Sequence, residues 1–199
     1  DELYINGHVT GNSPYLTFEW KAGKDGEHHE VKTQLIGEYN FANALAAVTI
    51  GHFFNVESEK IDAALKEYTP QNNRSQLKQT ADNTLIIDAY NANPTSMQAS
   101  ISNFHNMEVD NKMLILGDMR ELGKDGPEEH QKIADFLTEC GFKEVMLVGD
   151  QFAAAKHNFP TYPDASAVIE ALQKNKPHGK TILIEGSNGI KLSTVIDYL

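Results

Sequence analysis

The sequence predicts an α/β protein whose larger part is a parallel β-sheet covered by helices on both faces. Two observations carry this prediction. Beyond about residue 70, short continuous apolar runs alternate with stretches of helical periodicity, which is typical of buried parallel strands joined by crossover helices. Before residue 70, strand-like alternation is followed by two helical stretches. The pattern changes once, so we expect one whole domain and part of another.

The first 36 residues are predicted to be β-structure. Leu3-Tyr4-Ile5 is a short apolar run, and Asn6-Gly7 after it is a turn signal. Residues 15–20 alternate aromatic with smaller side chains, and residues 31–35 alternate again. Between them, Gly23-Lys24-Asp25-Gly26 marks a hairpin turn.

Two helices are predicted next, over residues 39–54 and 58–68. The first has apolar residues at helical spacing and is rich in alanine, and the second carries one apolar stripe. Residues 69–73 form a polar stretch that contains Pro70. This stretch is the best candidate for a domain boundary, which divides the chain into residues 1–70 and 71–199.

Strands and helices alternate in the second part. Four apolar runs are predicted strands: residues 85–87, 113–116, 145–148 and 182–184. Four helices are predicted between and after them: one beginning at Pro94 with Asn93 as its cap, one opening at Pro127, one over 165–172, and a final one with Leu192, Val195 and Ile196.

The composition is that of an ordinary globular protein. Hydrophobic residues make up 40% and charged residues 23% of the 199 residues, which excludes a disordered tail, a collagen-like repeat and a coiled coil. The net charge is −11, and both parts of the chain are acidic. Because no basic stripe is present to neutralise phosphates, nucleic acid is not an expected partner.

The cysteine content and the start of the chain bear on localisation. Cys140 is the single cysteine, so no internal disulfide forms, and we expect a cytoplasmic protein. No apolar run approaches about 18 residues, so no membrane span is expected. The chain begins at Asp1 without a methionine or a signal peptide, and we expect it to be part of a longer protein.

Small polar residues follow each predicted strand of the second part. They are residues 88–93, 117–120, 149–150 and 186–189. The ligand crevice of an open α/β sheet lies outside the carboxyl ends of its strands, so these segments are expected to line one edge. Turn chemistry alone explains residues 149–150. Residues 88–93, with an Asp, a Tyr and two Asn, are more polar than a turn requires.

Other apparent motifs are weaker. Gly179-Lys180-Thr181 resembles the end of a phosphate-binding loop, but Lys174 stands where that loop needs glycine and a strand follows instead of preceding. The histidines lack metal-ligand spacing and are expected at the surface. Cys140 lies on an apolar stripe and is expected in the core.

Asn40 and Asn43 share one face at the start of a predicted helix. A carboxamide offers a donor and an acceptor, which suits the edge of an adenine. Helix capping by Asn40, with Asn43 merely exposed, explains the pair equally well.

Taken together, four segments resemble the Mur ligase family, and within it the branch that adds a D-alanyl-D-alanine dipeptide. They are residues 37–47 (GEYNFANALAA), 88–97 (DAYNANPTSM) and 116–123 (LGDMRELG), with 185–189 (EGSNG) as a weaker match. The resemblance covers nearly the whole chain, but only the latter half of such an enzyme.

The resemblance implies a three-domain parent enzyme. Residues 1–70 would be the truncated end of its central, ATP-binding domain, and residues 71–199 its complete, Rossmann-like C-terminal domain. The reaction it implies is the ATP-dependent joining of D-alanyl-D-alanine to UDP-N-acetylmuramoyl-tripeptide through an acyl phosphate, in peptidoglycan precursor synthesis. The phosphate-binding loop and the Mg²⁺ ligands of the family lie outside this sequence, so the chain alone is expected to be inactive.

The resemblance also implies roles for particular residues. Asn40 and Asn43 would contact adenine, Arg74 would reach the ATP phosphates, and Asp88 would hold the ribose or orient the nucleotide. Closure of the C-terminal domain would complete this site and exclude water. The dipeptide site would be bordered by Asn91, Asn93, Asp118, Arg120, Ser187 and Asn188.

Two positions depart from the family pattern. Tyr39 stands where the family usually has histidine, and Glu185 where it usually has lysine. The second change removes a positive charge near the dipeptide edge.

Two other interpretations remain, together with one expectation about association. The chain could be a stand-alone Rossmann-like ligand-binding or interaction module without catalysis. An oxidoreductase is disfavoured because no G-x-G-x-x-G follows a strand. A truncated first domain would leave an exposed sheet edge, so we expect it to pair, with another copy of the chain as one candidate.

Overall fold

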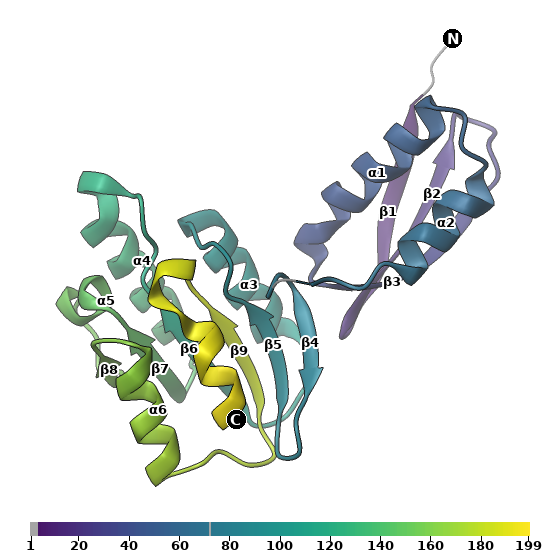
Figure 1. The fold of residues 1–199 in the computed structure, drawn as a ribbon. Helices are drawn as coiled ribbons and strands as arrows, with labels where there is room; N and C mark the ends of the chain where they lie inside the picture. Colours follow the sequence, from purple (N-terminus) through teal and green to yellow (C-terminus); the bar gives the residue numbers. More distant parts are fainter. Residues whose placement is uncertain (1–3, 72) are drawn as a thin grey trace. The chain divides into compact units, whose positions relative to one another are not determined.

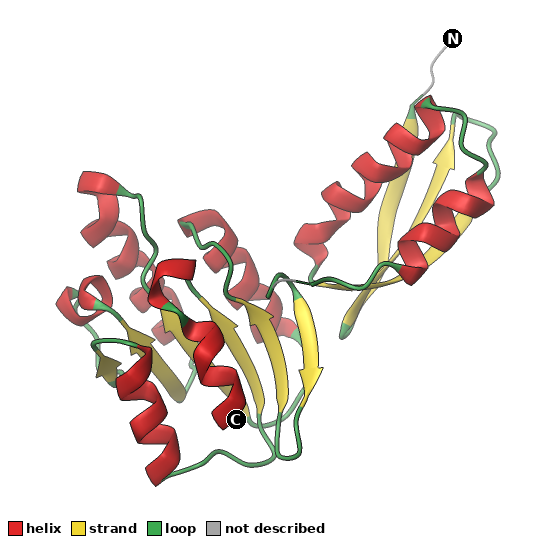
Figure 2. Ribbon diagram, viewed as in Figure 1, coloured by secondary structure: helices red, strands yellow, loops and turns green. Residues whose placement is uncertain are grey.

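The computed structural model describes residues 4–71 and 73–199, and these fall into two compact units divided between Pro70 and Gln71. Leu3 of the first predicted strand and Asn72 of the predicted boundary lie outside the described residues. The predicted α/β class is confirmed, because strands and helices alternate through most of the chain (Figure 2).

The first unit is a three-stranded antiparallel sheet with two helices (Figure 1). Its strands follow the order β1-β2-β3, and β2 directs Leu16, Phe18 and Trp20 into a core against the helices. Its elements are β1 (Ile5–Asn12), β2 (Tyr15–Ala22), β3 (His29–Ile36), the 3₁₀ turn η1 (Glu38–Asn40), α1 (Phe41–Phe53) and α2 (Ser58–Glu67).

The turn predicted at Asn6-Gly7 is wrong. Both residues lie inside β1, where Asn6 is opposite Lys21 and Gly7 opposite Trp20. Pairing with β2 outweighs the local turn preference, because each residue in the ladder gains cross-strand contacts that a turn lacks. The hairpin predicted at residues 23–26 is confirmed between β2 and β3.

Helix α1 is apolar on its outer side as well as its inner side. Ile50, Phe53 and Phe54 are 60%, 72% and 71% exposed. Large exposed apolar groups in a cluster mark surfaces that other molecules cover. Self-association through this unit stays a prediction.

A polar cluster joins α2 to the sheet of the first unit. The Trp20 indole Nε1 donates to Asp62 Oδ1 at 2.8 Å, and His29 Nδ1 lies 2.8 Å from Asp62 Oδ2. The His29 ring stacks on the Trp20 ring with centroids 4.5 Å apart. Asp62 is 8% exposed, so its carboxylate satisfies donors that water does not reach.

Replacing Asp62 with alanine is therefore expected to destabilise the first unit by about 2–3 kcal/mol, because the buried Trp20 N–H loses its acceptor. Urea unfolding followed by Trp20 fluorescence measures this change. Asp25→Ala, at an exposed loop position, is the matched control. An Asp62→Ala variant as stable as the control would contradict a structural role for the cluster.

The second unit is a six-stranded sheet with strand order β4-β5-β9-β6-β7-β8. All neighbouring pairs are parallel except β4 with β5. Its elements are β4 (Gln76–Gln79), β5 (Thr84–Asp88), α3 (Pro94–Asn106), β6 (Lys112–Gly117), η2 (Gly123–Asp125), α4 (Gly126–Glu139), β7 (Glu144–Val148), α5 (Asp150–Ala154), β8 (Thr161–Tyr162), α6 (Ala165–Lys174), β9 (Thr181–Glu185), η3 (Asn188–Ile190) and η4 (Leu192–Tyr198).

Helices cover both faces of this sheet, as predicted (Figure 1). On one face, Ile87 and Ile184 pack with Val168 of α6 and Val195 of η4. Side chains alternate along a strand, so Ile86, Asp88 and Glu185 point to the opposite face, where α3 and α4 lie. Within the described residues, no helix has the length and apolar character needed to cross a membrane.

Several elements of this unit differ from the sequence prediction. The polar strand β4 was not predicted; it pairs antiparallel with β5 at the edge of the sheet. The short elements α5 and β8 were not predicted either. The final helix is a 3₁₀ helix, although Leu192, Val195 and Ile196 are buried as expected.

Candidate functional site

The carboxyl ends of four neighbouring strands meet at one edge of the second unit. The strands β5, β9, β6 and β7 are adjacent and parallel, so the loops that follow them lie at the same end of the sheet. These loops contain every residue predicted for the dipeptide site. Part of this edge is an open cleft of about 530 Å³, lined by residues 118–123 with Gly126, Asp150 and Gln151.

The Asp118 side chain accepts hydrogen bonds from the backbone of α5. Its carboxylate accepts the N–H groups of Gln151 at 2.9 Å and Phe152 at 3.0 Å. Gly149 has a φ of +122°, and a Cβ there would come within 2.3 Å of this carboxylate. The glycine therefore leaves the space that Asp118 fills. Asp118 therefore stabilises the wall of the cleft, because both of its carboxylate oxygens accept hydrogen bonds from α5.

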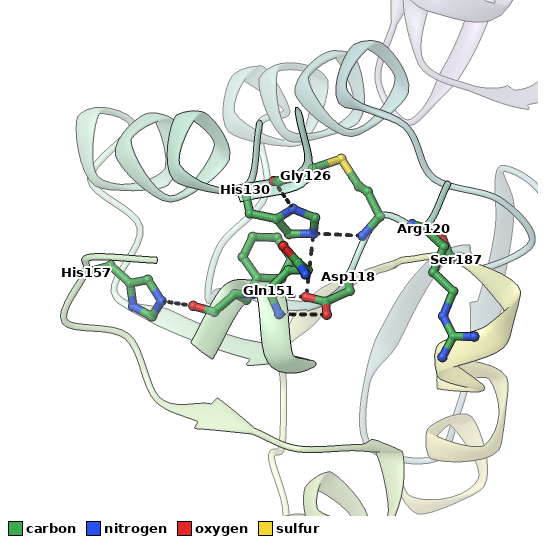
Figure 3. Close-up of polar contacts among 9 residues, drawn as sticks. Asp118, Arg120, Gly126, His130, Gln151, His157 and Ser187 are labelled. Atoms are coloured by element: carbon green, nitrogen blue, oxygen red, sulfur yellow. Dashed lines mark hydrogen bonds and ion pairs between the residues drawn. The ribbon is translucent and has the colours of Figure 1, made fainter. Parts of the chain in front are cut away.

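His130 of α4 lies beneath the same loop and is fully buried (Figure 3). The Met119 N–H donates to its Nε2 at 3.0 Å, and its Nδ1 lies 2.7 Å from the Gly126 carbonyl oxygen. Nε2 is thus an acceptor and Nδ1 carries the proton. Nε2 is also 3.5 Å from Asp118 Oδ1, but without a proton there this contact is not an ion pair. The expectation that the histidines lie at the surface is wrong here.

Ser187 connects the loop after β9 to the loop after β6. Its hydroxyl accepts the Arg120 N–H at 2.8 Å (Figure 3), and its own N–H donates to the Asp118 carbonyl at 3.3 Å. The two loops approach so closely that a Cβ on Gly186 would lie 3.0 Å from the Gly117 Cα. Ser187 is buried, while the side chain of Arg120 is exposed at the rim.

Asp88, at the end of β5, is bound to the segment that precedes β4. The Ser75 hydroxyl donates to Asp88 Oδ2 at 3.1 Å. Burial raises the pKa of the Asp88 carboxyl, while the Ser75 hydrogen bonds and the Arg74 charge oppose that rise. The Arg74 guanidinium lies 3.9 Å from the centroid of the Tyr90 ring. Tyr90 thus orients an exposed cation beside Asp88.

Glu185, at the end of β9, is the most buried acid of this edge, with 1% of its surface exposed. It is directly opposite Asp88 in the parallel pairing of β5 with β9. Burial first, and the Asp88 charge second, raise the pKa of Glu185 to about 8, although Ser100 and Ser96 hydrogen-bond to it. Its Oε2 has no hydrogen-bond partner among the described residues.

The remaining candidates lie in three places. Asn93 caps α3, because its side chain accepts the Ser96 N–H at 2.9 Å, and Asn91 and Asn188 are exposed in their loops. In the first unit, the Asn43 amide donates to Asn40 Oδ1 at 3.3 Å, and the Asn40 amide donates to the Ile36 carbonyl at 2.8 Å. Neither side chain caps α1, so the capping alternative for Asn40 is wrong.

The family described as "Mur ligase, glutamate ligase domain" matches residues 73–188 of this sequence. The chain belongs to the Mur ligase family. This match covers the strands and loops that form the edge just described, which confirms the predicted resemblance.

Curated Mur ligases are similar to the chain across both units. The UDP-N-acetylmuramoyl-tripeptide–D-alanyl-D-alanine ligase of Bacillus subtilis (strain 168) is 30% identical over 93% of this chain and 44% of its own length. The protein of that name from Escherichia coli (strain K12) is 29% identical over 98% of the chain and 44% of its own length. The chain therefore spans less than half of these Mur ligases.

Solved Mur ligase structures share the fold. A crystal structure of MurF from Acinetobacter baumannii superimposes with a TM-score of 0.82 at 25% identity, covering 95% of this chain and 43% of that one. MurF from Thermotoga maritima in complex with ADP gives a TM-score of 0.80 at 17% identity, covering 96% and 45%.

Several residues of this Mur ligase edge were not among the predicted site residues. Ser75 donates a hydrogen bond to Asp88, and Tyr90 contacts Arg74. His130 supports the loop at Asp118 by accepting the Met119 N–H. Sequence signals for them are weak, because a lone serine, tyrosine or histidine is common in any domain. The sequence did single out Glu185, as a departure from the family pattern. Cys140, expected in the core, is half-buried just after the end of α4.

Proposed function

We propose that this chain is the C-terminal part of an ATP-dependent ligase that joins D-alanyl-D-alanine to UDP-N-acetylmuramoyl-tripeptide. One observation supports this above all others: the relatives that carry this activity in their names align with both units of the chain, over as much as 98% of its length. A similarity confined to one unit would support only a common domain.

The residues of the second unit suit nucleotide binding. Arg74 is exposed and its guanidinium lies over the Tyr90 ring, and a guanidinium can donate the paired hydrogen bonds that a phosphate accepts. Asp88 offers carboxylate oxygens that accept from ribose hydroxyls. In the first unit, the carboxamides of Asn43 and Asn40 suit an adenine edge.

The dipeptide would lie along the segments that follow β5, β6 and β9. Arg120, exposed beside the cleft, suits the carboxylate of the dipeptide, and Asn91 and Asn188 are exposed amides that can orient it. Asp118, Asn93 and Ser187 hold these loops in place through their hydrogen bonds. Within residues 4–71 and 73–199, no three His, Cys, Asp or Glu side chains gather as metal ligands.

A chimera tests this function. The part of the Bacillus subtilis relative that precedes the matched region is joined to this chain, and phosphate release from ATP is measured. Release is expected only when the tripeptide and the dipeptide are both present. The chain alone is expected to release none, because it contains no complete phosphate-binding loop.

Two variants of the chimera sharpen the result. Arg74→Ala is expected to raise the KM for ATP about tenfold or more, because a charged phosphate contact is lost. Lys78 is an exposed cation on β4. Its replacement, Lys78→Ala, is the matched control and should leave the KM for ATP unchanged. A folded chimera that binds nucleotide without ligation would favour the non-catalytic module, and turnover by the chain alone would contradict its expected inactivity.

A further inference from the structure

Two acids lie side by side at the carboxyl ends of β5 and β9. Asp88 and Glu185 are direct partners in the parallel ladder, and side chains opposite one another in adjacent strands share a face. Two ionised carboxylates in such positions repel each other strongly, and pairs of this kind retain a proton.

The surroundings decide which of the two keeps the proton. Burial raises the pKa of Asp88 as well, but the Ser75 hydrogen bond and the Arg74 charge oppose that rise and favour its ionised form. Around Glu185, α3 contributes the hydroxyls of Ser96 and Ser100, and the β6 residue opposite it is apolar Leu116. After burial, the Asp88 charge is the next cause that raises the pKa of Glu185.

One oxygen of Glu185 supports the same assignment. Oε2 is buried and accepts no hydrogen bond from any described residue. An ionised carboxylate oxygen without hydrogen-bond donors is costly to bury, whereas a protonated carboxyl carries no charge. The proton therefore belongs on Glu185.

We propose that Asp88 and Glu185 share a single proton, held on Glu185, and that this proton sets the affinity of the adjacent Arg74 position for a phosphate-bearing ligand. With the proton in place, the pair carries one negative charge, on Asp88 near Arg74. Without it, a second charge opposes an anion. Glu185 is thus a specificity-determining residue that acts at a distance from the ligand. The ligand part of this inference rests on the proposed nucleotide binding.

Carboxyl ¹³C NMR of the 199-residue chain tests the proton directly. A glutamate signal that is absent in Glu185→Gln is expected to titrate far above the other glutamates, near the pKa of about 8. In Asp88→Asn the midpoint is expected to fall, because the neighbouring charge is gone. A Glu185 signal that titrates with the other glutamates would overturn the proposal.

ADP binding tests the consequence, followed by amide chemical shifts at about pH 7 and about pH 9. The affinity of the unchanged chain is expected to fall about five- to tenfold over this range, relative to Glu185→Gln. Glu185→Gln is neutral at both pH values and nearly the same size, so it cancels any effect from ADP itself. Glu170→Gln, exposed on α6, should behave like the unchanged chain.

The outcomes distinguish the position of the proton from its effect on ligand affinity. Equal pH profiles for the unchanged chain and Glu185→Gln would overturn the effect on the ligand. Failure of ADP to bind at either pH would count against the proposed nucleotide role and the ligand part together, while the NMR titration would still decide the position of the proton.

Discussion

Glu185→Gln is expected to stabilise the second unit at about pH 7 by roughly 2–3 kcal/mol. The side chain is 1% exposed, and its pKa is raised from 4.5 to about 8, first by burial and then by Asp88. At neutral pH Glu185 is protonated in the folded chain and ionised in the unfolded chain, and this difference lowers the free energy of unfolding. Glutamine has nearly the shape of the protonated acid and does not ionise, so this loss of stability is absent from the variant.

The sign of the pH dependence follows from the same two pKa values. Below about pH 4.5 both states hold the proton, so the ionisation of Glu185 contributes nothing. Between 4.5 and about 8 the folded state binds more protons than the unfolded state, so stability falls as pH rises. Above that range both states are ionised and the penalty is constant.

Urea unfolding at about pH 5, 7 and 9 measures this effect. The gain from Glu185→Gln should be small at the lowest pH and largest at the highest. Glu170→Gln, exposed on α6, should show no such trend. A gain that is equal at all three values, or a loss of stability at neutral pH, would contradict a buried and protonated Glu185.

Asp118→Ala is expected to lower the free energy of unfolding of the second unit by about 2–4 kcal/mol. The substitution removes the acceptor for the N–H groups of Gln151 and Phe152, at 2.9 and 3.0 Å. Asp118 is 7% exposed, so water does not readily replace the carboxylate. Asp118→Asn keeps one acceptor oxygen and should lose less.

Hydrogen exchange locates this effect, and unfolding in urea gives its size. The amides of Gln151 and Phe152 should exchange faster in Asp118→Ala, whereas amides in the first unit should not change. Asp110→Ala, at an exposed position before β6, is the control. If Asp118→Ala proved fully stable but lost dipeptide binding, its role would be contact with the substrate and not support of the loop.

Local elements of the fold could be predicted because their signals are contiguous. Asn93 and Pro94 predict the start of α3, and the structure contains the capping box between Asn93 and Ser96. The run Leu85-Ile86-Ile87 is a strand because it is apolar on both sides and buried on both faces. Such features need no information from elsewhere in the chain.

Features that depend on a partner outside their own stretch of sequence could not be predicted. Strand β4 has four mostly polar residues, and it is a strand because β5 offers a free edge to pair with. His130 sits in an amphipathic helix, and its burial follows from the loop at Met119 that covers it. Neither leaves a pattern in its own stretch of sequence.

The sequence by itself determined the fold class, most strand and helix positions and the family, because apolar periodicity, caps and motif spacing are written within short segments. Only the tertiary structure decided the chemistry of the edge. Strand order brings Asp88 and Glu185 together from distant parts of the chain, and burial of Glu185 then raises its pKa. Folding likewise assigns Asp118 to the backbone of α5, because hydrogen bonds and burial are properties of the assembled sheet.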